Sequence, residues 1–435
     1  MYRDIARLIL YRDLGEDSIL LKLAGIFEDF DRGDKTSAEL TTRIYEQMKA
    51  LLDLSTQYGF DHNLWHNYLT FLLLTNENSF SMTSEKIGAN DGTVNHFAKG
   101  DFAVFKHLFD FDFAPIEKAL GIDCFSTVCH YHSIQKKERM YNKNVSEKVQ
   151  QVSRLLEQAQ NEEEIFQIVT DFYAAYGVGM FGLNRAFRIR HLEEGVEFLP
   201  INNTERVLLD DLIGYELQKK KLIENTEAFI KGLPCNNVLL CGDAGTGKST
   251  SIKALLNEYY DQGLRMIEIY KHQFQDLSSI IAQVKNRNYR FIIYMDDLSF
   301  EDFEIEYKYL KAVIEGGMET KPDNVLIYAT SNRRHLIKET WSDRDDIEVD
   351  NGMHRSDTMQ EKLSLVARFG VTIYYGKPSQ KEYFTIVKEL RKRYPAITCS
   401  DEELCQEANK WELSHGGISG RTAQQFINDM AGKGA

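Results

Sequence analysis

The chain has 435 residues, of which 43% are hydrophobic and 27% charged, so it is neither disordered nor fibrous and is long enough for two or three domains. Its net charge of −14 disfavours duplex nucleic acid as a generic ligand, and its six scattered cysteines indicate no disulfide framework. No apolar run reaches the ~20 residues that span a bilayer, so we expect a cytoplasmic protein with no membrane partner.

The residue pattern over positions 1–200 predicts a mostly helical domain. Apolar residues recur at helical spacing along residues 40–52, after a Thr36-x-x-Glu39 pattern that is typical of a capping box. Two further stretches have the pattern of helices, Lys143–Gln160 and Glu162–Tyr176. Residues 1 to about 170 show no resemblance to a family, and we expect the domain to recognise a partner.

Two patterns in the first half indicate chemistry only weakly. The stretch CFSTVCHYH offers possible zinc ligands, but its spacing matches no closed zinc pattern, and we expect a buried strand; the four residues are Cys124, Cys129, His130 and His132. Another group, His62, Trp65 and His66, reads as the packing face of one helix. The stretch GVGMFG, residues 177–182, matches G-x-G-x-x-G, but it follows a helical pattern, which argues against a dinucleotide site.

Beyond residue 205, short apolar runs alternate with helical patterns, which predicts a parallel sheet covered by helices on both faces. The runs are Asn236–Cys241, Arg265–Tyr270, Phe291–Met295, Asn324–Thr330 and Val371–Tyr375. After Tyr375 the pattern is helical again. We therefore expect an α/β domain over residues 201–376 and a small helical domain over residues 377–435.

A glycine-rich loop follows the first of these runs. It fits the phosphate-binding pattern G-x-x-x-x-G-K-[ST] in full: Gly242, Asp243, Ala244, Gly245, Thr246, Gly247, Lys248 and Ser249, with Thr250 next in the helix. Glycines let backbone amides converge on phosphate oxygens at a helix N-terminus. Lys248 is expected to neutralise the β- and γ-phosphates, and the Ser249 hydroxyl to ligate Mg²⁺. The alternative, a glycine-rich turn without a ligand, explains less of the pattern.

Polar residues at the ends of later strands supply the remaining chemistry. Asp296 is expected to hold Mg²⁺ and Asp297 to polarise the attacking water, because both follow an apolar strand. Asn332, after the next strand, is suited to contact the γ-phosphate or that water. Arg368 and Arg421 offer guanidinium groups for charge that develops during phosphoryl transfer.

This assembly resembles an AAA+ ATPase from about Val207 to the C-terminus. GDAGTGKS resembles the Walker A motif and FIIYMDD the Walker B motif, while Asn332 matches sensor 1, Arg368 the arginine finger and Arg421 sensor 2. The amino-acid sequence of these segments is similar to that of a family of bacterial AAA+ ATP-binding proteins catalogued as a domain of unknown function. The resemblance implies a P-loop NTPase sheet, a C-terminal helical lid, ATP with Mg²⁺, and nucleotide contacts at Ile213 and Gly214.

The sequence departs from the AAA+ pattern in two places. Many AAA+ proteins have Asp-Glu in Walker B, whereas the second acid here is Asp297, whose reach to a water is shorter. Protein unfoldases carry an aromatic-hydrophobic-glycine pore loop after the second strand, whereas this chain has Tyr270-Lys271-His272. Threading of a polypeptide is therefore not expected.

We expect an ATPase that couples hydrolysis to the remodelling or loading of a protein or nucleoprotein client. In such an ATPase, we expect Arg368 of one subunit to complete the ATP site of the neighbouring subunit. This arrangement implies a homo-oligomeric ring. A nucleotide-gated binding module with little hydrolysis is the main alternative, motivated by Asp297. A P-loop kinase is a further alternative, against which the sensor-like strand and the two late arginines argue.

Overall fold

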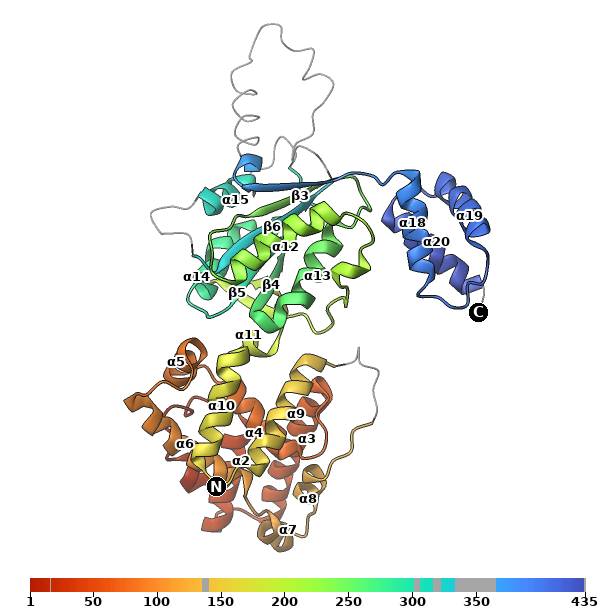
Figure 1. Cartoon of the computed structure of the whole chain (residues 1–435). Coiled ribbons are helices and arrows are strands. Elements are labelled where there is room, and N and C mark those ends of the chain that lie inside the picture. The colour runs from red at the N-terminus through yellow and green to blue at the C-terminus, as the bar shows by residue number, and fades with distance from the viewer. Residues whose placement is uncertain (16, 135–140, 301–305, 316–321, 333–364, 434–435) are drawn as a thin grey trace. The chain divides into compact units, whose positions relative to one another are not determined.

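The computed structural model describes the whole chain except residues 16, 135–140, 301–305, 316–321, 333–364 and 434–435. Contacts divide the chain into two compact units (Figure 1). The first unit comprises Met1–Arg185 and Pro200–Thr204, and the second comprises Ala186–Leu199 and Glu205–Ala435. The second unit therefore includes a segment before Pro200, where the sequence suggested a boundary.

The first unit is mostly helical (Figure 1). Its helices are α1 (Tyr2–Ile5), α2 (Ile19–Arg32), α3 (Ser37–Tyr58), α4 (Leu64–Thr75), α5 (Ser79–Ile87), α6 (Thr93–Phe109), α7 (Ala114–Leu120), α8 (Cys124–Cys129), α9 (Lys143–Gln158), α10 (Glu162–Tyr176) and α11 (Gly179–Leu183). The predicted capping box is confirmed, because Thr36 Oγ1 accepts a hydrogen bond from Glu39 N and Glu39 Oε2 accepts one from Thr36 N.

Two local expectations for this unit were wrong. The segment from Cys124 forms the short helix α8 instead of a strand, because Phe125 and Val128 are buried at a helical spacing of three residues. His62 does not share a helix with Trp65. It precedes α4, which begins after the N-cap Asn63, and it forms an antiparallel bridge with Tyr131.

Several charged side chains are buried in the first unit, and that of Asp101 has a clear structural purpose. Asp101, on α6, is 1% exposed and accepts backbone hydrogen bonds from Ile9, Leu10 and Tyr11 at 2.8–3.2 Å. These amides lie just after α1, where no helix or strand supplies them with acceptors. The carboxylate therefore fixes the N-terminal segment against the helical core.

Replacing Asp101 with alanine is expected to destabilise the protein by about 3 kcal/mol, because each buried amide left without an acceptor costs ~1–3 kcal/mol. Urea unfolding followed by circular dichroism measures this loss. Asp53→Ala is the control, since Asp53 forms an exposed pair with Lys49 that contributes under ~1 kcal/mol. Equal stability of the two variants would contradict this account of Asp101.

The second unit is built on a seven-stranded sheet with the order β2-β1-β4-β5-β6-β3-β7. Its strands are β1 (Ala186–His191), β2 (Val196–Pro200), β3 (Val238–Gly242), β4 (Leu264–Ile269), β5 (Arg290–Met295), β6 (Val325–Ser331) and β7 (Val371–Tyr375). The five predicted strands are confirmed, and β4, β5, β6, β3 and β7 pair in parallel. The strands β1 and β2 were not predicted, although β1 pairs in parallel with β4.

The register of the sheet brings three loops to one edge. Cys241 of β3 pairs with Ser331 of β6, and Met295 of β5 pairs with Ala329 of β6. Since β6 lies between β3 and β5, the residues that follow these three strands emerge side by side. The glycine-rich loop, the two aspartates and Asn332 follow these strands.

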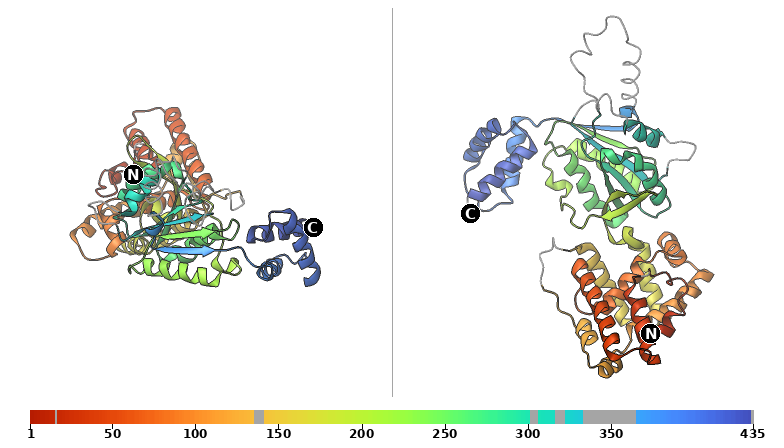
Figure 2. Two further views of the ribbon diagram at one scale, coloured as in Figure 1. Left: turned by 90° about the horizontal axis from the view of Figure 1, so that it is seen from above. Right: turned by 180° about the vertical axis from the view of Figure 1, so that it is seen from behind.

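The helices of the second unit form two groups. Those that flank the sheet are α12 (Glu216–Ile230), α13 (Lys248–Tyr259), α14 (Leu277–Val284) and α15 (Glu306–Glu315), with the 3₁₀ turns η2 (Leu209–Asp211), η3 (Tyr260–Gln262) and η4 (Lys271–Asp276). The C-terminal helices are α18 (Gln380–Arg391), α19 (Asp401–Ser414) and α20 (Gly420–Lys433) (Figure 2). They share a small core of their own that includes Tyr383, Leu404 and Phe426. No helix in the described part of the chain is long and apolar enough to cross a membrane.

Candidate active site

The glycine-rich loop is shaped by close contacts with its surroundings. Gly242, with φ 132°, ends β3, and a Cβ there would lie 2.1 Å from the carbonyl oxygen of Tyr375 on β7. Gly247, with φ 92°, caps α13, and a Cβ there would lie 2.3 Å from Leu212 Cδ1. Only glycine fits these two positions, and the loop consequently ends at the N-terminus of α13, where backbone amides and the helix dipole favour an anion.

Lys248, the first residue of α13, directs its ammonium group back across the loop. Nζ donates to the carbonyl oxygens of Gly242 at 3.0 Å and Asp243 at 2.6 Å, and to Oδ1 of Asn332 at 3.0 Å. Burial lowers the pKa of Lys248, and the carboxylates of Asp243 and Asp297 act in the opposite direction. The side chain is 5% exposed, so its charge is placed where water screens it little.

Asp296 accepts two hydrogen bonds from hydroxyl groups. Ser249 Oγ, on α13, lies 2.7 Å from Asp296 Oδ1, and Thr330 Oγ1, on β6, lies 2.6 Å from the same oxygen. Burial by itself raises the pKa of Asp296, but the hydroxyl donors Thr330 and Ser249 outweigh it, and the net pKa is lowered. Asp296 is therefore an anion at neutral pH.

Asp297 is held in an unusual backbone conformation. Its φ is 51°, in the left-handed region, and its amide donates to Thr330 Oγ1 at 3.0 Å. Its Oδ1 accepts a hydrogen bond of 2.8 Å from Nδ2 of Asn332, whose Oδ1 in turn accepts from Lys248. A left-handed non-glycine residue costs about 1–3 kcal/mol, and the bonds to β6 offset that cost. Asn332 thus connects the lysine of the loop to the second aspartate.

The oxygen atoms at this edge suit a hard divalent cation. Ser249 supplies a hydroxyl and Asp296 a carboxylate, and their 2.7 Å separation shows that both reach the same point. Mg²⁺ prefers one or two such protein oxygens and completes its shell with water and phosphate. These two residues therefore fit the metal site expected from the sequence.

A cavity of about 810 Å³ opens beside these groups, within the second unit. Its size is in the range of small-molecule sites. The helix α20 contributes to it directly, because Arg421 N donates to the Gly245 carbonyl at 3.2 Å. The expected residues that line the cavity are Ile213, Gly245, Thr246, Gly247, Lys248, Ser249, Thr250, Asp296, Asp297, Asn332 and Arg421.

Other expected residues lie elsewhere. Gly242, Asp243, Ala244 and Gly214 are not lining residues of this cavity, although the first two accept hydrogen bonds from Lys248. Arg368 does not line it either. It forms an ion pair with Glu315 at the end of α15.

Three groups of lining residues were missed from the sequence. One lies before α12 and comprises Glu205, Arg206, Val207, Asp211, Leu212 and Tyr215. Thr330 is the hydroxyl that joins the two aspartates, and its only sequence signal is a polar residue in an otherwise apolar strand. The C-terminal helices contribute Ile386, Leu390, Gly420, Gln424 and Gln425, and the turn after α18 contributes Arg393. These residues read as ordinary positions of amphipathic helices, so no local pattern separates them from their neighbours.

Comparison with known proteins places most of the chain in one family. The family described as "Protein of unknown function (DUF815)" matches residues 183–434, which is more than half of the chain. The chain belongs to this family. The match covers the whole of the α/β sheet and the C-terminal helices, and it therefore includes all the residues of the cavity.

Similarity to proteins of known name is distant. A chaperone protein ClpB from Propionibacterium freudenreichii is 24% identical over 269 residues, which are 56% of this chain and only 28% of that protein. The AAA domain of FIGL-1 in complex with ADP is 17% identical over 53% of this chain and 74% of that chain, with a TM-score of 0.36. The RuvB Holliday junction branch migration motor of Thermotoga maritima is also 17% identical, over 52% of this chain and 70% of that chain, with a TM-score of 0.34.

The hydroxyl of Thr330 provides a test of this geometry. Thr330→Val removes a donor to Asp296 and an acceptor for the Asp297 amide, so the pKa of Asp296 is expected to rise and Mg²⁺-dependent nucleotide affinity to fall on the order of 10-fold. Calorimetric titration of ADP with and without Mg²⁺ measures this. Thr330→Ser keeps the hydroxyl and is expected to behave as the unaltered protein. A valine variant with full Mg²⁺ dependence would refute the role of this residue.

Proposed function

We propose that this DUF815 protein binds ATP with Mg²⁺ and hydrolyses it to ADP and phosphate. The single observation that carries the proposal is the convergence of two hydrogen-bonded groups on one cavity. One group joins Lys248, Asn332 and Asp297, and the other joins Ser249, Asp296 and Thr330. Phosphoryl transfer to water needs a phosphate cradle, a metal site and a group that polarises the water, and these residues supply each of them.

The proposed roles follow from the positions of the side chains. The loop amides and Lys248 hold the β- and γ-phosphates, while Ser249 and Asp296 hold Mg²⁺. Bound there, Mg²⁺ neutralises charge on the phosphate oxygens. Asp297 accepts a proton from the attacking water, and Asn332, already bonded to Asp297, orients that water or contacts the γ-phosphate.

We further propose that the C-terminal helices respond to the nucleotide. Arg421, at the start of α20, lines the cavity beside the loop and is suited to neutralise a phosphate. Ile213 also lines the cavity and is suited to contact the base, with Gly214 beside it. In this proposal the second unit binds the nucleotide, with residues 377–435 as its lid, and the first unit recognises a client.

We also propose that ATP hydrolysis is coupled to work on a client. The distant relative named a chaperone supports the remodelling or loading of a protein or nucleoprotein partner. A homo-oligomeric ring in the cytoplasm suits such work, with Arg368 of one subunit acting on the nucleotide of its neighbour. The pairing of Arg368 with Glu315 in this chain supports that reading, since it places the arginine away from its own chain's cavity.

A nucleotide-gated binding module is a second candidate, favoured by one observation. Asp297 is shorter than the glutamate common in AAA+ proteins, and its Oδ1 is already occupied by the amide of Asn332. A carboxylate held in this way polarises water less well, so hydrolysis would be slow. Binding of ATP would then act chiefly by changing the conformation of the protein. A phosphorylated small-molecule acceptor would instead identify a P-loop kinase.

Asp297→Asn is expected to bind ATP and Mg²⁺ with little change but to lose turnover by a factor on the order of 10² or more, because the water loses its proton acceptor. Phosphate release and calorimetric ATP binding measure the two effects separately. Lys248→Ala is the matched variant, expected to lose ATP binding as well. A protein without turnover in any condition, yet with tight ATP binding, would favour the binding module over the ATPase.

Arg368→Ala is expected to bind ATP normally but to hydrolyse it poorly, and mixing it with Asp297→Asn is expected to restore part of the activity. In mixed oligomers some sites combine an intact Asp297 with an intact Arg368 from the neighbour. Phosphate release across mixing ratios measures the recovery. Glu315→Gln, which removes only the partner of the arginine, is expected to keep turnover. No recovery at any ratio would exclude a shared site.

A further inference from the structure

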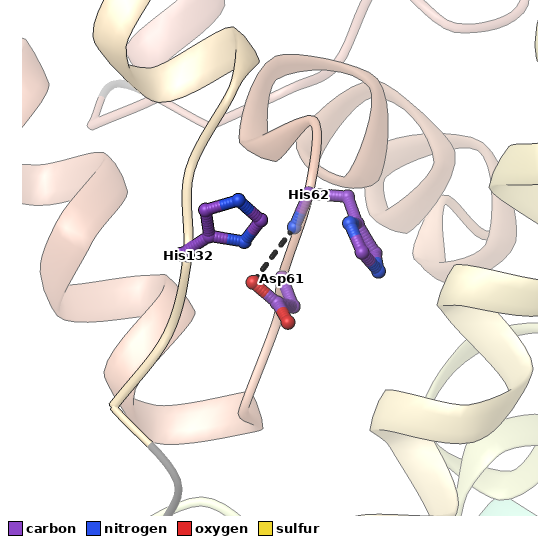
Figure 3. Close-up of side chains that lie close together, drawn as sticks. All are labelled: Asp61, His62 and His132. Carbon is purple, nitrogen blue, oxygen red and sulfur yellow. Dashed lines mark hydrogen bonds between the residues drawn. The ribbon is translucent and has the colours of Figure 1, made fainter.

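The first unit contains a group of metal-ligating side chains that is independent of the nucleotide cavity. Asp61, His62 and His132 each offer one ligand atom, and these atoms all lie within 4.8 Å of one another (Figure 3). Two of the residues precede α4 and the third follows α8, so the group joins segments that are about 70 residues apart in the chain. Among the described residues it is the one such group of three or more donors.

The backbone fixes the two segments that carry the donors. His62 N donates to the Tyr131 carbonyl at 3.0 Å, and Tyr131 N donates to the His62 carbonyl at 2.9 Å. Asp61 Oδ1 accepts from His62 N at 2.9 Å and from Ser133 N at 2.8 Å, so the carboxylate bridges both segments. Both of these bonds end on Oδ1, and no described residue donates to Oδ2. The carboxylate is thus oriented before any ligand arrives.

The conformation of His62 also departs from the ordinary. Its φ is 64°, in the left-handed region, which is uncommon for a residue with a side chain. It is one of three such non-glycine residues in the described chain, and another is Asp297 in the candidate active site. The exposed imidazoles of His62 and His132 lie with ring centroids 6.3 Å apart, nearly perpendicular to each other. Their exposure leaves them room to rotate toward a common ligand.

The three donors also line a cavity of about 340 Å³. Its other lining residues include His130, Arg154 and Glu157, so the wall is polar and charged. A cation held by the three donors would therefore face a space that admits water or a small anionic co-ligand. This is the arrangement of a metal site with open coordination positions, in contrast to a closed structural site.

We propose that Asp61, His62 and His132 bind a divalent transition-metal ion of the zinc class. Two imidazole nitrogens and one carboxylate oxygen are the donors that such ions select, whereas Mg²⁺ and Ca²⁺ prefer oxygen donors alone. Three protein ligands leave at least one position for water or a small ligand. Side-chain rotation at the two exposed histidines brings the nitrogens to bonding distance.

The geometry also explains why the cysteines nearby are not part of this site. Cys124 and Cys129 lie at opposite ends of α8. Burial, with a further contribution from Glu117, raises the pKa of each thiol to about 11, and neither sulfur belongs to the group of donor atoms that lie within 4.8 Å of one another. Of the four possible ligands in the stretch CFSTVCHYH, only His132 belongs to the group, and its partners come from the other segment.

Zinc titration of the nucleotide-free full chain, prepared without a histidine tag and treated with a chelator, tests the proposal. One equivalent of Zn²⁺ is expected to bind, and Co²⁺ is expected to give visible d–d absorption bands. His62→Ala, His132→Ala and Asp61→Asn are each expected to weaken Zn²⁺ binding on the order of 10- to 100-fold or more. Asp61→Asn keeps an acceptor at Oδ1, so circular dichroism is expected to show a folded protein.

Two control variants distinguish this site from other zinc-binding groups. His130→Ala removes an exposed histidine of the same cavity that is outside the group, and Asp296→Asn removes the carboxylate of the candidate active site. Both are expected to retain zinc binding. The proposal is overturned if the unaltered chain binds no zinc, or if the His130 or Asp296 variant loses zinc as fully as the His62 and His132 variants do.

Discussion

The placement of β6 between β3 and β5 is the constraint on which the candidate active site depends. Parallel pairing of the three strands brings the glycine-rich loop, the two aspartates and Asn332 to one edge of the sheet. Residues at the end of β6 then connect the other two strands: Thr330 bonds to Asp296 and to the Asp297 amide, and Asn332 bonds to Lys248 and Asp297. Without this order the same motifs would lie apart, and neither hydrogen-bonded group would form.

The charges at this edge are balanced in a way that favours a bound phosphate and metal. Lys248 is buried, and its ammonium donates to two loop carbonyls and to Asn332. Burial lowers the pKa of Lys248, although the carboxylates of Asp243 and Asp297 act in the opposite direction. Phosphate oxygens are stronger partners for an ammonium than neutral carbonyls are, so a phosphate in the loop would stabilise the charged form of Lys248. Asp296 remains charged beside it and is ready to hold a cation.

The sequence predicts the parts of this site that are contiguous and misses those that depend on distant segments. The five central strands, the glycine-rich loop and the two aspartates follow from local patterns, because apolar runs and glycine positions have direct steric causes. The role of Thr330 depends on the register between β5 and β6, and that of Arg393 on where the C-terminal helices fold back. The strands β1 and β2 were missed because β1 is partly exposed and interleaved with arginines, which hides its apolar pattern.

The histidines of the first unit show the same dependence on pairing at a smaller scale. His130 and His132 are two residues apart, and their spacing in the sequence does not show which of them is the better candidate ligand. A single bridge between His62 and Tyr131 separates their surroundings, because it aligns Ser133 with Asp61 and brings His132 beside them, while His130 stays at the end of α8 near the Ser126 carbonyl. Ligand identity is therefore decided by two backbone hydrogen bonds that no local motif encodes. A search for metal sites by spacing alone would join His132 to the cysteines and overlook Asp61 and His62.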